Sequence, residues 1–150
     1  MEKFTSLVTY GIGPSGDGDY HMNMIKALCY KALGDKKKAI EIINKLLSTQ
    51  NYNVLPFDYL HLGVLELEME NYPEAINAFK KEIEINDNLA DTHYYLALAY
   101  KKSGNKVGYE KNILMAKEFY SDGKRRTDPY IEPMDKVYLV DIDTGIKKGW

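Results

Sequence analysis

The fold of this chain is decided by residues 56–89, PFDYLHLGVLELEMENYPEAINAFKKEIEINDNL. Apolar residues recur at helical spacing in both halves of this stretch, which predicts two amphipathic helices. Between the halves, Asn71 and Glu74 have the spacing of a capping box, and Pro73 suits the first turn of a helix. We therefore expect a second helix to begin at this point and to end before Asn86.

Small residues indicate where the two helices approach each other. Gly63 lies inside the first helix, where a glycine costs about 1 kcal/mol relative to alanine. Ala75 and Ala78 are the small residues of the second helix. Because a glycine inside a helix usually allows close packing of a neighbour, we expect the second helix to pack against the first at Gly63.

The pattern of residues 56–89 recurs on both sides of this stretch. A shift of 34 residues forward places Phe79 on Ile113, and a shift of 36 residues back places it on Ile43. The two additional residues of the backward shift fall in residues 50–53, which have the composition of a loop. Three matches in register indicate three structural repeats.

Together these features resemble the tetratricopeptide repeat, a helix–turn–helix unit of 34 residues. The resemblance implies an all-α fold, a right-handed α-α superhelix (a solenoid) of three repeats at residues 20–55, 56–89 and 90–121. The third repeat is degenerate, since Gly108-Tyr109 replaces the usual small residue that opens its second helix. The resemblance is carried by Tyr59, Leu62, Gly63, Ala75 and Phe79.

The two ends of the chain do not follow the repeat. Residues 1–19 are expected to form an N-terminal capping segment, as a short helix or strand, and a glycine-rich loop. Residues 122–150 are expected to form a C-terminal capping tail, because a repeat array leaves the apolar face of its last helix open. The apolar stretch 130–142 should pack back on the array, as an extended segment or short helix, and residues 145–150 should be frayed.

Composition narrows the class of protein. The 150 residues allow one domain, and a hydrophobic content of 45% is ordinary for a soluble globular chain. The net charge of −2 disfavours a nucleic-acid or membrane-surface binder. No apolar run is long enough to cross a membrane. The single cysteine, Cys29, is expected in the core. A chain with one cysteine suits the reducing cytoplasm, although the alternative of a signal peptide that has been removed stays open.

Two short motifs resemble catalytic or cofactor sites but lack their context. Gly11, Gly13 and Gly16 form a G-x-G-x-x-G pattern, but the strands of a dinucleotide fold are not expected around it; the alternative is a connector that ends at Asp19 as a helix N-cap. The sequence Asp143-Thr144-Gly145 resembles an aspartic-protease signature, whose mechanism requires a second aspartate.

Metal ligands and catalytic groups are not predicted either. His21, His61 and His93 occur once in each first helix, without the spacing of a helical metal site, and are expected in a groove or on the surface. Asp17 and Asp19 lack the other ligands of a calcium loop. We therefore predict no catalytic residue, no metal and no cofactor, and expect a protein that is not an enzyme.

The resemblance implies a function in protein binding. In tetratricopeptide arrays the first helices line a concave groove that holds a peptide or helix of a partner, so we expect an adaptor or scaffold for a protein partner. The alternative is a self-associating structural module, such as a homodimer, in which the chain's own tail or a second copy fills the groove. The groove positions are Met24, Leu28, Phe57, Leu60, His61, Val64, Asp91, Tyr94, Tyr95, Leu98 and Lys101.

Overall fold

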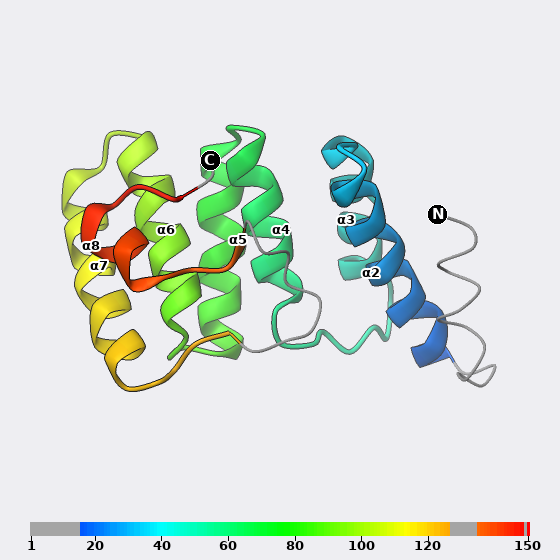
Figure 1. The fold of residues 1–150 in the computed structure, drawn as a ribbon. Helices are drawn as coiled ribbons and strands as arrows, with labels where there is room; N and C mark the ends of the chain where they lie inside the picture. The colour runs from blue at the N-terminus through cyan, green and yellow to red at the C-terminus, as the bar shows by residue number, and fades with distance from the viewer. Residues whose placement is uncertain (1–15, 127–134, 149) are drawn as a thin grey trace. The chain divides into compact units, whose positions relative to one another are not determined.

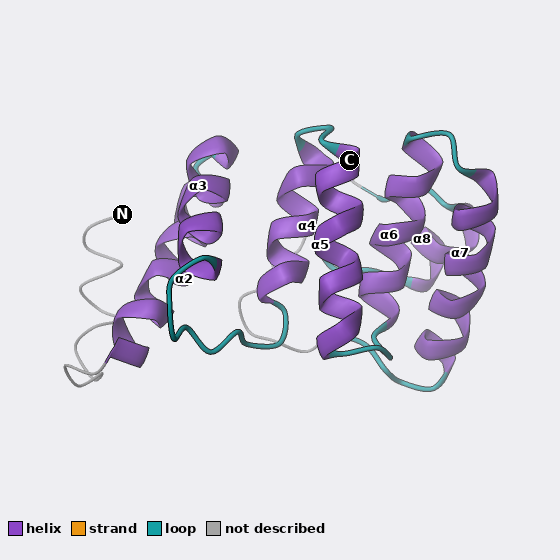
Figure 2. Cartoon of the chain, turned by 180° about the vertical axis from the view of Figure 1, so that it is seen from behind, coloured by secondary structure: helices purple, strands orange, loops and turns teal. Residues whose placement is uncertain are grey.

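The structure is a computed structural model that describes residues 16–126, 135–148 and 150. Apart from one 3₁₀ residue at Asp135, the regular structure of these residues is α-helical, with no strand among them (Figure 1, Figure 2). The expected all-α repeat fold is thereby confirmed. The helices are α2 (Gly16–Ala32), α3 (Lys36–Leu47), α4 (Asp58–Glu68), α5 (Tyr72–Ile85), α6 (Ala90–Lys102), α7 (Lys106–Ser121) and α8 (Leu139–Thr144).

Several expectations fall on residues that are not described. The short helix or strand at residues 2–10, two of the three glycines of the G-x-G-x-x-G pattern, and residues 130–134 of the apolar tail lie outside the described part of the chain. Gly16 is the first residue of α2, so Asp19 lies inside this helix and is not its N-cap. The boundaries of the segments 1–19, 20–121 and 122–150 stay predictions.

The chain divides into two compact units, residues 1–58 and 59–150. The first unit contains α2 and α3, joined by a turn in which Gly34 has a φ of 89°. The N-cap of helix α3, Asp35, accepts a hydrogen bond from the Lys38 N–H at 3.1 Å. Its buried stripe consists of Ala39, Ile43 and Leu46, which are spaced three and four residues apart as in an amphipathic helix.

In the second unit, α4 and α5 pack at the glycine that the sequence singled out. A Cβ atom built on Gly63 would lie 2.3 Å from Cε1 of Phe79, so the ring occupies the space that any side chain would need. Phe79 is fully buried, as are its equivalents Ile43 and, nearly so, Ile113. The repeat register therefore identifies core residues correctly in all three helix pairs.

The start of α5 corrects one prediction. Asn71 is the N-cap as expected, but its side chain makes no capping hydrogen bond, so the capping box with Glu74 is absent. The Asn71 amide instead donates to Oε2 of Glu66 on α4 at 2.8 Å. This bond ties the end of one helix to the start of the next, and Pro73 supplies the preset φ of the first turn.

Helices α6 and α7 form the third pair, which Figure 2 shows beside α4 and α5. Every residue of α6 from Ala90 to Ala99 is buried. Gly108 on α7 is the small residue that permits this packing, since a Cβ atom there would lie 2.7 Å from Cγ of Tyr100. The third repeat is therefore less degenerate than its sequence indicates, with the small residue displaced by one position.

Candidate binding face

The predicted groove positions are divided between the two units. Met24, Leu28 and Phe57 belong to the first unit, where Met24 is buried and the other two are half-buried. The remaining positions lie in the second unit, on α4 (Leu60, His61, Val64) and on α6 (Asp91, Tyr94, Tyr95, Leu98, Lys101). All of these second-unit residues are buried except Lys101.

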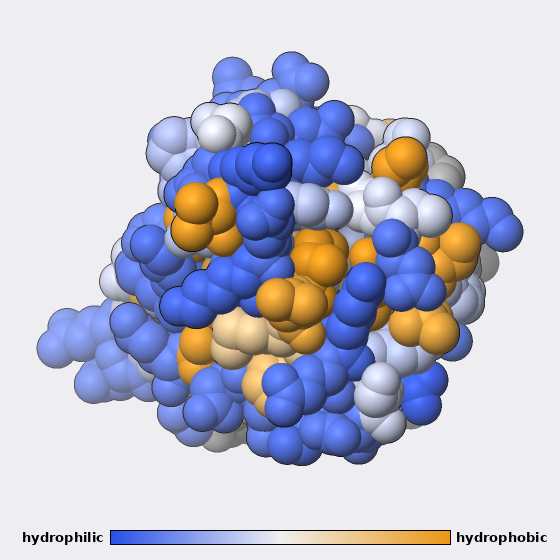
Figure 3. Space-filling view, turned by 90° about the vertical axis from the view of Figure 1, so that its left-hand side faces the viewer, coloured by the Kyte–Doolittle hydropathy of each residue, from blue (hydrophilic) through white to orange (hydrophobic). Residues whose placement is uncertain are grey.

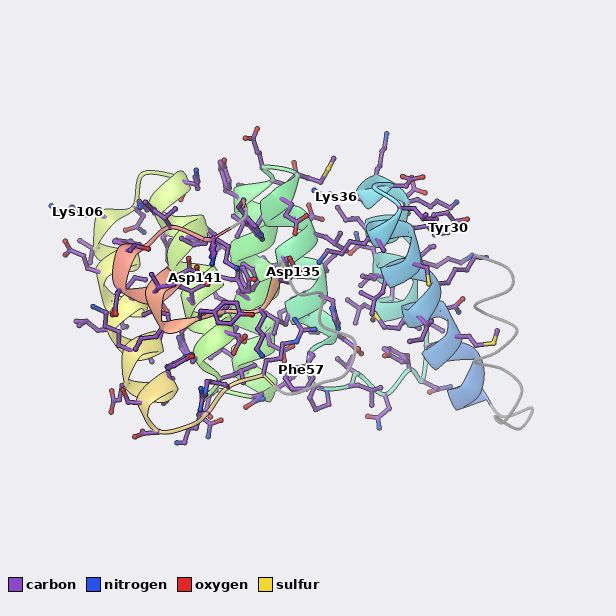
Figure 4. The ribbon with its side chains drawn as sticks, viewed as in Figure 1. Tyr30, Lys36, Phe57, Lys106, Asp135 and Asp141 are labelled. Atoms are coloured by element: carbon purple, nitrogen blue, oxygen red, sulfur yellow. The ribbon has the colours of Figure 1, made fainter. Side chains whose placement is uncertain are left out.

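Some of these positions contact residues 135–148 and 150, here called the C-terminal segment. In Figure 1 it passes, in red, in front of α6 and α7, and Figure 4 labels Asp135 and Asp141 on it. We call the side of α6 that carries Asp91, Tyr95, Leu98 and Lys101 the α6 face; these residues are three or four positions apart and share one side of the helix.

Three side chains of the α6 face bind main-chain groups of the C-terminal part of the chain. The Asp91 carboxylate accepts from the Arg126 N–H at 2.9 Å. The Tyr95 hydroxyl donates to the carbonyl oxygen of Asp135, and the Lys101 ammonium donates to that of Gly145 at 3.0 Å. Because each bond goes to the backbone, these three contacts do not depend on which side chains the bonded residues carry.

Helix α4 contributes a fourth polar contact, through His61. One guanidinium nitrogen of Arg126 lies 3.2 Å from Nδ1 and 3.0 Å from Nε2 of His61, and both side chains are buried. Only a neutral imidazole can accept from a guanidinium. The geometry therefore favours an unprotonated His61 while Arg126 is in place.

Tyr95 is the centre of an aromatic cluster on the same face. Its ring lies 6.2 Å from Phe79, 5.6 Å from Tyr94 and 5.6 Å from Trp150, measured between centroids. Burial raises the pKa of the Tyr95 hydroxyl well above its ordinary value, and the charges of Asp135 and Asp91 raise it further. The hydroxyl therefore stays protonated and able to donate.

The C-terminal segment is held in shape by one buried carboxylate. Asp141 accepts from the Tyr138 N–H and from the Lys148 N–H, each at 2.9 Å, and lies 3.4 Å from the Lys147 ammonium. The two side chains of this ion pair are only 1% and 2% exposed. The expectation that residues 145–150 are frayed is therefore wrong for the described residues, which the pair and the Trp150 ring tie down.

Other predicted sites have structural roles. His93 is buried, with its ring nitrogens 3.1 Å from the Asn112 oxygen and 3.0 Å from the Asp87 carbonyl, so it is a core residue and not a groove residue. Asp143 of the Asp-Thr-Gly motif is exposed and pairs with Lys117 at 3.7 Å. Cys29 is half-buried where full burial was expected, and burial raises the pKa of its thiol.

Within the described residues, no three His, Cys, Asp or Glu side chains gather as a metal site would require. None of the described helices has the length and apolar character that crossing a membrane demands.

Apolar side chains also gather on the outer side of the last helices. Figure 3 shows them at the centre of this side, surrounded by hydrophilic residues. The exposed large apolar residues of α7, α8 and the turn that follows are Val107, Leu114, Leu139, Val140 and Ile146.

The sequence identified the positions of the α6 face but not what binds them. Arg126, Asp135, Asp141 and Trp150 were not predicted as site residues. The signal was the apolar composition of residues 130–142, which predicted that the tail packs back on the array but not which of its residues make the contacts.

The helix pairs and the buried small residues at their crossings define a helical repeat protein. One family model, described as TPR repeat, matches residues 63–104, and a second, described as tetratricopeptide repeat, matches residues 24–49. TPR is the abbreviation of tetratricopeptide repeat. The chain therefore contains tetratricopeptide repeats, as the resemblance implied.

Solved structures give the same fold. PcrH in complex with the chaperone binding region of PopB has a TM-score of 0.65 and 17% sequence identity, covering 73% of this chain and 86% of that one. PcrH from Pseudomonas aeruginosa has a TM-score of 0.64 at 17% identity, covering 73% and 80%. Comparison with curated proteins gave no match. At this identity the structural likeness establishes the fold alone.

Proposed function

We propose that this protein is a non-enzymatic adaptor that binds a segment of a partner protein on the first helices of its repeats. The observation that carries the proposal is the set of hydrogen bonds between main-chain groups and the side chains of Asp91, which accepts, and of Tyr95 and Lys101, which donate. Side chains on one helix face that bind main-chain groups are suited to peptide recognition. The structural neighbour PcrH, solved with a segment of PopB, supports the same class of function.

A second candidate follows from the same contacts. The chain's own C-terminal segment occupies the α6 face, so a structural module whose face is permanently closed accounts for these bonds as well. The exposed apolar residues of α7 and α8 favour a version in which two copies associate. Sedimentation at several concentrations separates a monomer from such a dimer.

The adaptor function is tested by site-specific photo-cross-linking in the full chain. A photoreactive residue replaces Lys101 on the α6 face or, as the matched control, Lys111 on α7; both lysines are exposed. In a lysate of the organism that encodes the chain, the adaptor proposal expects a partner peptide to cross-link at 101 and not at 111. Cross-links at 111 alone, or equal labelling at both positions, would contradict it.

The obvious substitutions on this face are unsuitable as a test. Charged replacements of Tyr94 and Leu98 are attractive from the sequence, but these side chains are 0% and 5% exposed. A charge at either position would destabilise the core, and loss of binding would then report unfolding.

A further inference from the structure

We infer, on the basis of the proposed adaptor function, that the α6 face binds a partner segment through main-chain carbonyls, and that residues 135–148 and 150 occupy this place until such a segment displaces them. The bound C-terminal segment thus shows the chemistry of the partner. It consists of a main-chain carbonyl for Tyr95, a second carbonyl for Lys101, and an aromatic ring beside Tyr95.

The first argument is that the contacts to α6 can be replaced by another chain. Two of the three backbone bonds of the α6 face go to carbonyl oxygens of the C-terminal segment. Every residue of any peptide carries such an oxygen. The Trp150 ring, 46% exposed, lies against Tyr95 without being enclosed. A competing segment with an aromatic residue at the matching distance would make the same contacts.

The second argument is that the C-terminal segment can leave as a unit. Its strongest polar interactions are internal, since Asp141 bonds to Tyr138, Lys147 and Lys148 of the same segment. Its ion pair to α7, between Asp143 and Lys117, is exposed on both sides and contributes about 0–1 kcal/mol. Detachment breaks the bonds of Tyr95 and Lys101 to the segment, which a competing peptide can replace, and exposes the buried side chains of Val137 and Ile142.

The third argument concerns competition. A segment tethered to its site has an effective concentration of the order of millimolar, so it outcompetes a weak ligand and yields to a strong one. The apparent affinity for a partner is reduced by the fraction of chains whose face is open. The C-terminal segment therefore sets a threshold that rejects weakly matching peptides.

The test uses the full chain and a synthetic peptide with the sequence of residues 135–150 in which Phe replaces Trp. Trp150 is the only tryptophan of the chain, so its emission reports whether the chain's own segment is docked. Adding the peptide should shift the Trp150 emission to that of an exposed indole. A shuffled peptide is the control and should leave the emission unchanged.

A variant measures the competition directly. Ile142 is 1% exposed, and Ile142→Asp should release the chain's own segment while the α6 face stays intact. We expect the peptide to bind this variant at least about tenfold more tightly than the wild type in calorimetry. Far-UV circular dichroism that keeps its helical signal, apart from α8, shows that the repeats remain folded.

The outcomes separate this inference from the proposed function. Unchanged Trp150 emission at saturating peptide, or equal affinity of the variant and the wild type, would overturn the displacement. If a partner still cross-links at position 101 in that case, the adaptor function stands and the partner binds beside the docked segment. If the peptide displaces the segment and no protein cross-links at 101, the adaptor function fails and the displacement stands.

Discussion

The replacement Asp141→Asn should detach the C-terminal segment without unfolding the repeats. The carboxylate accepts two main-chain N–H groups at 2.9 Å and faces the Lys147 ammonium at 3.4 Å, where both side chains are at most 2% exposed. In asparagine, one of the two oxygens becomes an NH₂ group, which points a donor at a donor, and the Lys147 charge loses its partner.

The magnitude follows from the burial of this pair. Removing one partner of a buried ion pair costs about 3–5 kcal/mol, because the remaining charge is left in a medium that cannot solvate it. The segment can avoid this cost by leaving α6 and exposing Lys147 to water. Each 1.4 kcal/mol is a factor of ten, so the ratio of docked to free segment should fall by roughly a hundred to a few thousand.

The assay is Trp150 emission together with hydrogen exchange of residues 135–148. The matched control is Asp143→Asn, the same replacement two residues further along α8, where the side chain is 54% exposed and its pair with Lys117 is 3.7 Å long. We expect a red shift and fast exchange for Asp141→Asn and wild-type behaviour for Asp143→Asn. Adding Lys147→Met to Asp141→Asn should restore part of the docking, since it removes the uncompensated charge.

If Asp141→Asn behaves like Asp143→Asn, the buried pair does not hold the segment, and the reasoning is wrong. If it unfolds α4 to α7 as well, the segment is an integral part of the core and cannot act as a displaceable ligand.

Three further predictions concern the repeats. Phe79→Ala should lower the free energy of unfolding by about 3–5 kcal/mol, because Phe79 is fully buried against Gly63 and Tyr95; an unchanged urea midpoint would contradict this burial. Gly63→Ala should destabilise despite a helix-propensity gain of about 1 kcal/mol, because its Cβ would overlap the Phe79 ring at a cost of about 1–3 kcal/mol or more. The double variant Gly63→Ala/Phe79→Leu should be less destabilised than the two separate effects summed, and strict additivity would refute the contact. Glu66→Gln should stabilise the chain at pH 7, because burial, followed by the charge of Glu74, raises the pKa of Glu66, and the Asn71 hydrogen bond lowers it less. The stability from the protonated carboxyl is complete below its ordinary value of 4.5 and is lost as the pH rises through the raised pKa, so the gain of the variant should vanish below pH 4.5 in urea titrations.

The repeats could be predicted because their contacts are periodic in the sequence. A shift of 34 or 36 residues placed Phe79 on Ile113 and Ile43, and the structure buries all three. Once one residue is aligned with its equivalent in another repeat, the buried side of the whole helix is known, because helical spacing determines which other residues share that side. Helix types and most helix boundaries follow from the same rule. The capping box at Asn71 did not form, and the Asn71 amide donates to Glu66, an acceptor that the local motif does not include.

The accessibility of the binding face could not be predicted in the same way. Helix α6 is apolar or aromatic around most of its circumference, and it is buried throughout from Ala90 to Ala99. A sequence pattern of this kind shows that all sides of the helix are covered, but it does not show which side is covered by neighbouring repeats and which by a segment outside them. Tyr94 therefore appeared as a groove residue, whereas its ring is fully buried.

The C-terminal segment illustrates why such a cover has no sequence signature of its own. Its internal bonds connect Asp141 to residues three to seven positions away, yet they form only if the carboxylate is taken out of water. That burial depends on the repeats, and the hydrogen bonds from α6 to the segment join residues that are 40 and 44 positions apart in the sequence. An aspartate and a lysine six positions apart in the sequence have no predictive value alone, because exposed pairs of this kind contribute almost nothing. The same two residues form a buried ion pair when the repeats exclude water from them. The C-terminal segment gains its structure only from the α6 face that it covers. It is therefore suited to be replaced there by a partner that makes the same contacts.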